Sequence, residues 1–274
     1  MSLENKVVLI TGASSGIGEA CAKLMAKGGA TVILQARSED KLETIVKEIL
    51  DHGGKAHFYT TDLTDIEAVK KQAIAIKNKV GVPDVIVNSA GAGNWLSIFD
   101  TSEEDFRDMM SAPYFAAVYT IKAFLVDMVK RNSGHIITIN SAACYFTFPG
   151  ALGYLSTRWA TRGFQEGLAE ELRTTNVAVT NIVAGKVDSP YFTNNPVSAE
   201  RIPKIATGIM KTLTVEDVAE TIIRSIKSRK RTIIIPWQMS FSVLMNRYFP
   251  GLFRLLMRST GYKEIPEEIS RLNT

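Results

Sequence analysis

Three polar side chains stand at a spacing that suits proton transfer. Ser141 follows a predicted strand, and Tyr154 and Arg158 occupy positions i and i+4 of a segment with helical period. Residues four apart on a helix share one face, so we expect the phenol and the guanidinium to lie side by side. A phenol, with a pKa of about 10, is a poor base at neutral pH, and a nearby cation favours its ionised form. The alternative is that Ser141 begins a turn and Tyr154 is an ordinary helix residue.

A glycine-rich segment near the N-terminus is typical of phosphate binding. The sequence TGASSGIG occupies residues 11–18, after a short apolar run and before a segment of helical period. Glycines permit a tight turn and let backbone N–H groups approach a pyrophosphate, while the following helix N-terminus favours negative charge. The strand–loop–helix context therefore predicts a dinucleotide site formed by Gly12, Ser14, Ser15, Gly16, Ile17 and Gly18.

The elements that must position these residues alternate along the chain. Seven short apolar runs are separated by segments of helical period, and the runs are continuous, as in parallel strands covered on both faces. This pattern predicts an α/β protein with a doubly wound, seven-stranded parallel sheet in a single domain over residues 1–236. A C-terminal amphipathic helical extension, residues 237–274, is expected to follow without forming an independent domain. The predicted strands are residues 6–10, 31–35, 56–60, 84–88, 135–140, 177–183 and 232–236.

Composition and charge exclude several classes of protein. The 274 residues are 46% hydrophobic, which supports a sizeable core, and the formal net charge of +4 is spread along most of the chain. That distribution argues against a nucleic-acid partner. Cys21 and Cys144 provide no disulfide framework, and no metal site is expected. Neither a signal peptide nor a membrane-spanning stretch is recognisable, so we expect a cytoplasmic protein.

The glycine-rich segment, together with Asn88-Ser89-Ala90-Gly91, resembles the motifs of the short-chain dehydrogenase/reductase family. The resemblance extends from about residue 6 to residue 236. It implies a Rossmann fold that binds NAD or NADP, and a homo-oligomer. The family usually has a second asparagine where this chain has Ser89.

The resemblance also assigns roles to the polar residues. It implies that Ser141 polarises a substrate carbonyl, and that Tyr154 acts as general acid in reduction and as general base in oxidation. In the family, a lysine at the place of Arg158 lowers the pKa of the tyrosine and holds the nicotinamide ribose. Besides the glycine-rich loop, the expected cofactor-binding residues are Arg37, Asp62, Leu63, Asn88, Ala90, Gly91, Tyr154, Arg158, Gly185, Val187 and Ser189.

Two positions depart from the family pattern in ways that bear on catalysis. Arg158 keeps the positive charge, but a guanidinium is longer and flatter than an ammonium and does not release a proton. The family also has an asparagine in the helix after the fourth strand, where it helps to hold a water in a proton relay. The register of residues 106–125 places Pro113 there, with Ser111 as the alternative.

The end of the second predicted strand indicates which dinucleotide is bound. The sequence there is Gln35-Ala36-Arg37-Ser38, with no carboxylate to accept from a ribose 2′-hydroxyl. The planar fork of Arg37 suits a 2′-phosphate, which predicts NADP(H) in preference to NAD(H). The alternative is that Arg37 is a solvated loop residue. For Asp62, which matches an adenine-contacting aspartate of the family, the alternative is a helix N-cap.

Aromatic residues near these motifs predict a small lipophilic substrate. Trp95, Tyr145, Phe148 and Tyr191 are the expected substrate-binding residues, with core or dimer packing as the alternative. Residues 241–258 show two short, basic, amphipathic helical patterns. They are compatible with peripheral membrane contact, and equally with a cover for the substrate pocket or a dimer contact.

These observations together predict an enzyme, an NADP(H)-dependent oxidoreductase that interconverts a lipophilic carbonyl and an alcohol. Tyr154 would handle the proton, Ser141 would orient the oxygen, and Arg158 would supply positive charge. Because of Arg158 and Pro113, two alternatives stay open. One is a redox-neutral isomerase or cyclase, and the other is a cofactor-binding relative that catalyses nothing.

Overall fold

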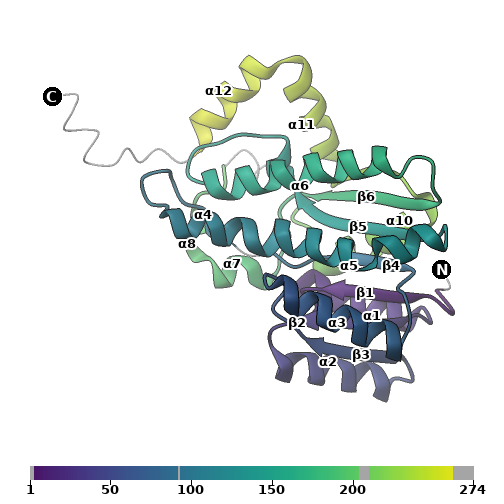
Figure 1. Cartoon of the computed structure of the whole chain (residues 1–274). Helices are drawn as coiled ribbons and strands as arrows, with labels where there is room; N and C mark the ends of the chain where they lie inside the picture. The colour runs from purple at the N-terminus through teal and green to yellow at the C-terminus, as the bar shows by residue number, and fades with distance from the viewer. Residues whose placement is uncertain (1–2, 92, 204–209, 262–274) are drawn as a thin grey trace.

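The seven predicted strands form one parallel sheet. A computed structural model describes residues 3–91, 93–203 and 210–261, and its strand order is β3-β2-β1-β4-β5-β6-β7 (Figure 1). Each observed strand begins and ends within one residue of its predicted bounds. The strands are β1 (Val7–Thr11), β2 (Thr31–Ala36), β3 (Lys55–Thr60), β4 (Val85–Asn88), β5 (Gly134–Ser141), β6 (Val177–Ala184) and β7 (Thr232–Ile235).

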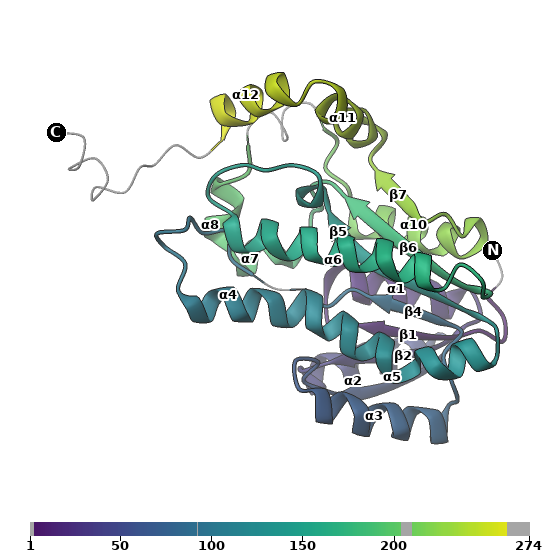
Figure 2. The same ribbon diagram turned by 45° about the horizontal axis from the view of Figure 1, so that its top comes forward.

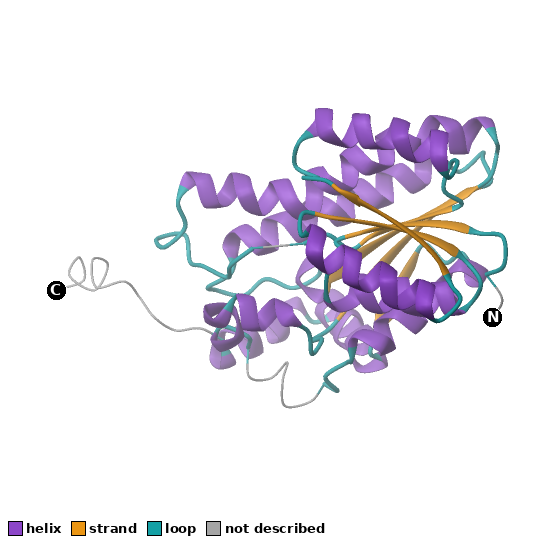
Figure 3. Cartoon of the chain, turned by 90° about the horizontal axis from the view of Figure 1, so that it is seen from below, coloured by secondary structure: helices purple, strands orange, loops and turns teal. Residues whose placement is uncertain are grey.

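Helices cover both faces of the sheet, which confirms the doubly wound α/β fold (Figure 3). The helices α1 (Gly16–Lys27), α2 (Glu39–Asp51) and α10 (Val215–Ser228) pack on one face. The helices α3 (Ile66–Lys79), α5 (Ala116–Lys130) and α6 (Leu152–Glu171) pack on the other. Successive residues of a strand point to opposite faces, so Val8 and Ile10 enter one core and Leu9 the other. The continuous apolar runs of the sequence follow from this double burial.

The helix that was expected to carry Pro113 changes its winding at that residue. α4 (Glu103–Met110) continues through a π-helical turn, Ser111–Phe115, into α5. A proline has no N–H for the carbonyl four residues earlier, here that of Met109. The hydroxyl of buried Thr157, on α6, lies 3.2 Å from the Met109 carbonyl oxygen and 2.9 Å from the Gly153 carbonyl oxygen of its own helix, and it can donate its one hydrogen to either. The wide turn at Pro113 thus has a hydroxyl of the neighbouring helix within hydrogen-bonding distance of the carbonyl that the proline leaves without its helical N–H.

The same long helix corrects one expectation. Residues Glu103–Lys130 form a helix that is long and apolar enough to cross a membrane by length and composition. No such stretch was expected from the sequence. The helix supplies Ile121, Phe124 and Met128 to the core beneath α3 and β5, which is the position of a core helix of the sheet.

The C-terminal extension begins with two helices that form a hairpin. α11 (Trp237–Tyr248) follows β7, and α12 (Pro250–Thr260) turns back against it (Figures 1 and 2). Residues 262–274 of the predicted extension lie outside the described residues. Between β6 and α10, the described residues include the one-turn helices α7 (Pro190–Asn194) and α8 (Pro196–Glu200).

Removing the Thr157 hydroxyl tests the account of the π-helical turn. We expect Thr157→Val to lower the free energy of unfolding by about 1–2 kcal/mol, because the Met109 carbonyl loses a buried donor. In a Pro113→Ala background the loss should shrink, because the introduced alanine would supply an N–H to the same carbonyl. Urea denaturation of the four proteins of this cycle measures the coupling.

Thr161→Val is the matched control for that cycle. The Thr161 hydroxyl donates to the Thr157 carbonyl, 2.9 Å away within the same helix, where a helical N–H is also available. Thr161→Val should lower the free energy of unfolding by less than Thr157→Val does, and by the same amount whether or not Pro113 is replaced. Equal losses for Thr157→Val with and without Pro113 would contradict the account.

Candidate active site

A cavity of about 860 Å³ lies at the carboxyl ends of the central strands. This is where open α/β sheets bind ligands, because the loops that leave adjacent strands diverge there. The walls come from the glycine-rich loop, the β2–α2 and β3–α3 connections, the ends of β4, β5 and β6, α6, and the C-terminal hairpin. One end is therefore polar and rich in glycine, and the other is aromatic and aliphatic.

The glycine-rich loop is packed so closely that side chains are excluded at two positions. Gly12 has φ +64°, and a Cβ there would lie 2.7 Å from Ala90 Cα. A Cβ on Gly18 would lie 2.3 Å from the Gly12 carbonyl oxygen. The Thr11 hydroxyl accepts from the backbone N–H groups of Ser89 and Ala90, at 3.2 and 3.3 Å. The loop is thereby joined to the β4 end, and its backbone is open towards the cavity ahead of α1.

Most of the predicted cofactor-binding residues are brought together. The cavity is lined by Gly12, Ser14, Ser15, Gly16, Ile17, Arg37, Asp62, Leu63, Ala90, Gly91, Tyr154, Arg158, Gly185, Val187 and Ser189. Two predicted residues do not line it. Gly18 lies under the loop, where its role is close packing, and the Asn88 amide donates to the Thr138 hydroxyl at 3.2 Å between β4 and β5.

The β3–α3 connection shows that Asp62 is not the N-cap of α3, which was the alternative role considered for it. The helix N-cap is Asp65, whose side chain accepts from the N–H groups of Glu67 and Ala68. Asp62 lines the cavity and accepts instead from the backbone N–H and the hydroxyl of Thr64, at 2.9 and 2.7 Å. These two hydrogen bonds, with a smaller contribution from the charge of Arg37, lower the pKa of the Asp62 carboxyl.

The β2–α2 connection places two cations on the cavity wall. Arg37 and Lys41 both line it, together with Ser38, the N-cap residue of α2. The sequence analysis had singled out Arg37 alone. Lys41 lies in the first turn of α2. The N-terminus of this helix carries a partial positive charge, which adds to the positive potential around Arg37 and Lys41.

The three predicted catalytic residues meet at the centre of the cavity. Ser141, at the end of β5, accepts from the Ala143 N–H at 3.2 Å, which leaves its own hydrogen available to donate. Tyr154 and Arg158 are buried on α6, and the Arg158 guanidinium carbon lies 4.8 Å from the centroid of the Tyr154 ring. The cation is thus held over the face of the aromatic ring, as in a cation–π contact.

The remaining contacts of Arg158 fix the direction of its guanidinium. Nη1 donates to the Ile139 carbonyl at 3.4 Å, and Nη2 is 3.4 Å from the position that a Cβ on Gly91 would take. Nε is buried without a hydrogen-bond partner in the described part of the chain. The guanidinium therefore spans the space between α6, β5 and the loop after β4.

A residue that the sequence analysis missed connects these pieces. The buried amide of Asn140 donates to the Arg158 carbonyl at 3.2 Å, and its oxygen accepts from the Ser141 N–H at 2.8 Å. Asn140 thus sets α6 against the end of β5. The signal available for it was an amide side chain directly before Ser141, at the end of a predicted strand.

The turn around Pro113 offers no amide side chain to the cavity. Pro113 is buried in the π-helical turn, and the Ser111 hydroxyl donates back to the Arg107 carbonyl at 2.9 Å. From this long helix, the described residues that line the cavity are Ala112 and Ala116. Methyl groups thus stand where the family resemblance led us to look for an amide.

The aromatic end of the cavity matches the predicted substrate pocket in three residues of four. The Trp95 ring centroid lies 5.1 Å from that of Tyr154 and 5.2 Å from that of Phe148. The Tyr191 hydroxyl donates to the Gly93 carbonyl at 2.6 Å, and burial raises the pKa of this phenol. These rings place an apolar surface directly beside the Tyr154 ring.

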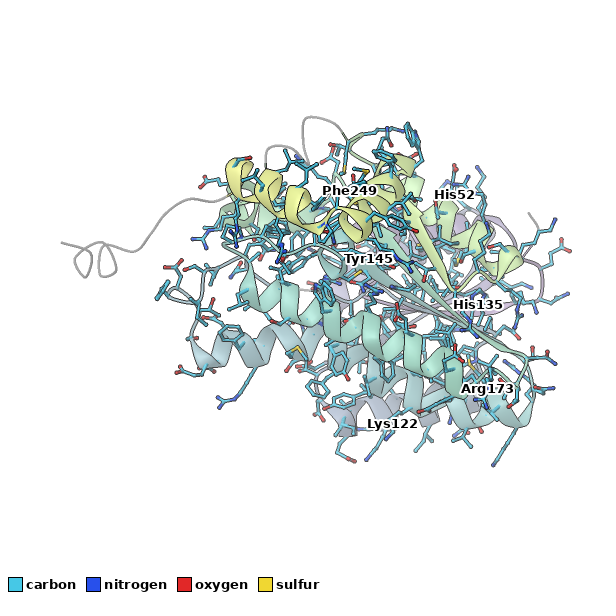
Figure 4. The ribbon with its side chains drawn as sticks, turned by 90° about the horizontal axis from the view of Figure 1, so that it is seen from above. His52, Lys122, His135, Tyr145, Arg173 and Phe249 are labelled. Carbon is cyan, nitrogen blue, oxygen red and sulfur yellow. The ribbon has the colours of Figure 1, made fainter. Side chains whose placement is uncertain are left out.

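Tyr145 is the predicted substrate-binding residue that lies elsewhere. Its ring stacks under the guanidinium of Arg162, 4.0 Å from the ring centroid, and its carbonyl accepts from the Asn246 amide on α11 (Figure 4). The next residue, Phe146, points into the cavity instead. Residues 142–144 form a 3-10 turn after Ser141, and that winding decides which ring faces inward.

The C-terminal hairpin closes the apolar end. Met239 and Met257 are buried against Phe146, and the hairpin residues that line the cavity include Phe241, Met245, Phe249, Leu252, Phe253 and Leu256. A pocket cover is one of the three alternatives that the sequence pattern allows for this segment. The structure places it over the pocket.

The other candidate groups do not build a second centre. No cluster of three or more His, Cys, Asp or Glu side chains suited to a metal ion occurs among the described residues. Burial raises the pKa of the Cys144 thiol to about 12, so it is protonated near neutral pH. His135 is buried at the far end of β5, where it bonds with the Thr180 hydroxyl at 2.8 Å (Figure 4).

Comparisons with known proteins agree with this arrangement. Residues 6–199 match the family described as short chain dehydrogenase. Dehydrogenase/reductase SDR family member 7B of Xenopus tropicalis is 30% identical over 274 residues, covering 96% of this chain and 87% of the relative. Estradiol 17-beta-dehydrogenase 11 of Homo sapiens is 29% identical over 260 residues, covering 94% and 83%.

Solved structures give the same result. The alcohol dehydrogenase from the archaeon Thermococcus sibiricus, complexed with 5-hydroxy-NADP, has 29% identity and a TM-score of 0.74, covering 84% of this chain and 95% of that one. A short chain dehydrogenase/reductase from Burkholderia phymatum in complex with NAD shares the fold, with a TM-score of 0.83 at 21% identity over 97% of this chain and 99% of that one. The Rossmann sheet, the glycine-rich loop and these matches together show that the chain belongs to the short-chain dehydrogenase/reductase family of oxidoreductases.

Proposed function

We propose that this protein is an NADP(H)-dependent oxidoreductase that interconverts a lipophilic carbonyl and the corresponding alcohol. The observation that carries the proposal is the Arg158 guanidinium, held over the Tyr154 ring where the glycine-rich end of the cavity meets its aromatic end. A cation at this place supports proton transfer by the phenol even though it is not the lysine of the family pattern.

The residues at the polar end fit a nicotinamide dinucleotide. The packed loop at Gly12 and the N-terminus of α1 would hold the pyrophosphate, and the Asp62 carboxylate would accept from the adenine amino group. Gly185 and Val187 would present backbone groups to the nicotinamide amide. When bound, the nicotinamide supplies hydride transfer at its ring carbon C4.

The preference for NADP(H) follows from the β2–α2 connection. A 2′-phosphate carries negative charge and several acceptor oxygens, which Arg37 and Lys41 can neutralise together. The α2 N-terminus at Ser38 adds N–H donors. The ribose 2′-hydroxyl of NAD(H) would find no carboxylate at this strand end.

The chemistry at the carbonyl is assigned to three side chains. Ser141, whose hydrogen is available, donates to the substrate oxygen, and Tyr154 gives that oxygen its proton during reduction. Arg158 stabilises the negative charge that the phenol takes on as the proton leaves. Trp95, Phe148 and Tyr191 exclude water from the reacting carbonyl and hold an apolar substrate against it.

The relatives support a lipophilic substrate class. One is described as an estradiol 17-beta-dehydrogenase, which names a steroid as its substrate. The aromatic and hairpin residues of this cavity provide a comparably apolar surface. A steroid or long-chain ketone is therefore the first class of substrate to assay.

A redox-neutral isomerase or cyclase is the second candidate, and the long helix favours it. Ala112 and Ala116 provide no group to hold a relay water, and a guanidinium does not pass on a proton. Product formed without any change in NADP(H) would identify this second function.

Arg37→Asp tests the cofactor preference. We expect the Kd for NADPH to rise about 10- to 100-fold, because a charge-assisted contact to phosphate is lost and a repulsion replaces it. Fluorescence titration of NADPH measures it. Arg224→Asp, which replaces an exposed side chain of α10 that does not line the cavity, is the control and should leave the Kd unchanged. An unchanged Kd in Arg37→Asp would overturn the preference.

Tyr154→Phe tests the proton donor. We expect kcat/KM for ketone reduction to fall about 10²- to 10⁴-fold, because the general acid is removed. The Kd for NADPH should change by less than about threefold, since the ring remains over Arg158. Tyr119→Phe, which does not line the cavity, is the control. Equal activity in Tyr154→Phe and wild type would remove Tyr154 from the mechanism.

Two substitutions at Arg158 test the role of its charge. We expect Arg158→Met to lower kcat/KM about 10²- to 10³-fold, because the stabilising charge is lost. Arg158→Lys should stay within about tenfold of wild type, because it restores a cation at the same helix position. Steady-state NADPH oxidation compares the three proteins. An inert wild type with an active Arg158→Lys would show that the arginine has abolished reduction here.

A further inference from the structure

The α11–α12 hairpin presents an apolar surface to solvent. Trp237, Leu244, Tyr248 and Leu255 are 75%, 50%, 66% and 64% exposed, and none of them lines the cavity. They are too many and too close along two short helices to be scattered surface residues. The hairpin stands at the top of the molecule in Figure 2.

The entrance of the substrate cavity opens on the same hairpin. Phe241, Phe249, Leu252 and Leu256 each line the cavity and are also exposed by more than a third. Phe241 comes from α11, Leu252 and Leu256 come from α12, and Phe249 lies at the turn between them. These four residues therefore join the apolar lining of the cavity to the exposed apolar surface of the hairpin. Figure 4 shows Phe249 at this position on the hairpin.

The charge of the hairpin indicates what covers this surface. Residues 237–260 contain Arg247, Arg254 and Arg258 and no acidic residue. A second copy of the chain would bring arginines against arginines, whereas an anionic lipid surface complements them. Exposed tryptophan and tyrosine, as at Trp237 and Tyr248, are enriched at the boundary between lipid and water.

A second groove beside the hairpin has matching chemistry. It has a volume of about 760 Å³, and Arg254 and Arg258 line it together with Leu152, Leu155 and Trp159 of α6. Two cations one helical turn apart above an apolar floor suit an amphiphile with an anionic head group. Phe148 lines both this groove and the substrate cavity.

We propose that the α11–α12 hairpin docks on anionic phospholipid bilayers and that the lipophilic substrate enters the cavity directly from the lipid. Leu244 and Leu255 would enter the acyl boundary, the three arginines would contact phosphates, and the ring of Phe241, Phe249, Leu252 and Leu256 would open into the apolar phase. The route of entry rests on the proposed function, whereas the docking does not.

The basic run at residues 227–231 is not part of this surface. It precedes β7, whereas the hairpin follows that strand, so the two lie at opposite ends of it. Arg229 and Arg231 are engaged there by the Asn176 carbonyl and by Glu170.

Vesicle co-sedimentation of the full chain tests the docking. We expect binding to phosphatidylcholine vesicles that contain phosphatidylglycerol, weaker binding at high salt, and little binding to phosphatidylcholine alone. The double variant Leu244→Glu/Leu255→Glu should bind the anionic vesicles at least about tenfold more weakly, because it removes apolar contacts and adds repulsion. Ile74→Glu, which replaces a similarly exposed apolar residue on α3, is the matched control and should bind like wild type.

Activity measurements separate the docking from the proposed function. Turnover of a water-soluble ketone should be the same in the double variant and in wild type, while turnover of a ketone embedded in anionic vesicles should fall at least about tenfold. Vesicle binding without turnover of any ketone would overturn the proposed function and leave the docking in place. Equal binding of the double variant and wild type to anionic vesicles would overturn the docking. A dimer in wild type that becomes a monomer in the double variant, with no binding to vesicles, would assign the surface to a second copy instead.

Discussion

The buried contact between Arg158 and Tyr154 is the interaction on which the rest of the active site depends. A guanidinium removed from water is costly unless it has partners, and Arg158 has the Ile139 carbonyl and the face of the Tyr154 ring. Its buried position makes it sensitive to any negative charge that develops nearby, since screening by water is weak there. The fold then has to hold α6 against its neighbours. The Asn140 amide joins α6 to the end of β5, and the Thr157 hydroxyl lies within hydrogen-bonding distance of the Met109 carbonyl of α4.

Much of this was predictable from the sequence, because the signals are local. Each strand is a short apolar run whose residues alternate between two cores, so its bounds follow from composition alone. The glycine-rich loop has a fixed position between a strand and a helix, and Ser141, Tyr154 and Arg158 follow from their spacing on one strand and one helix. Arg37 could be identified because it stands at a strand end whose place in the fold is fixed.

The remaining features depend on contacts that only three-dimensional packing determines. Asn88 bonds to Thr138 across two strands, and Gly18 packs beneath the loop that it belongs to. After Ser141, the aromatic ring that lines the cavity is that of Phe146 and not that of Tyr145. A short 3-10 turn lies between Ser141 and these two residues. The two helices of the hairpin have an ordinary amphipathic pattern. Such a pattern does not indicate whether their apolar faces pack on the substrate pocket, on a second copy or on a membrane. The π-helical turn around Pro113 and the nearby Thr157 hydroxyl depend on how the long helix packs against α6.

The most direct test of the central claim, that a site with arginine beside its tyrosine still performs reduction, is isotope transfer. Wild-type protein is mixed with a lipophilic ketone and with NADPH that carries deuterium at both nicotinamide C4 positions, and the product is examined by mass spectrometry. The account predicts one deuterium on the new carbinol carbon for each NADPH oxidised. An isomerised or cyclised product without deuterium, formed while NADPH is unchanged, would contradict it.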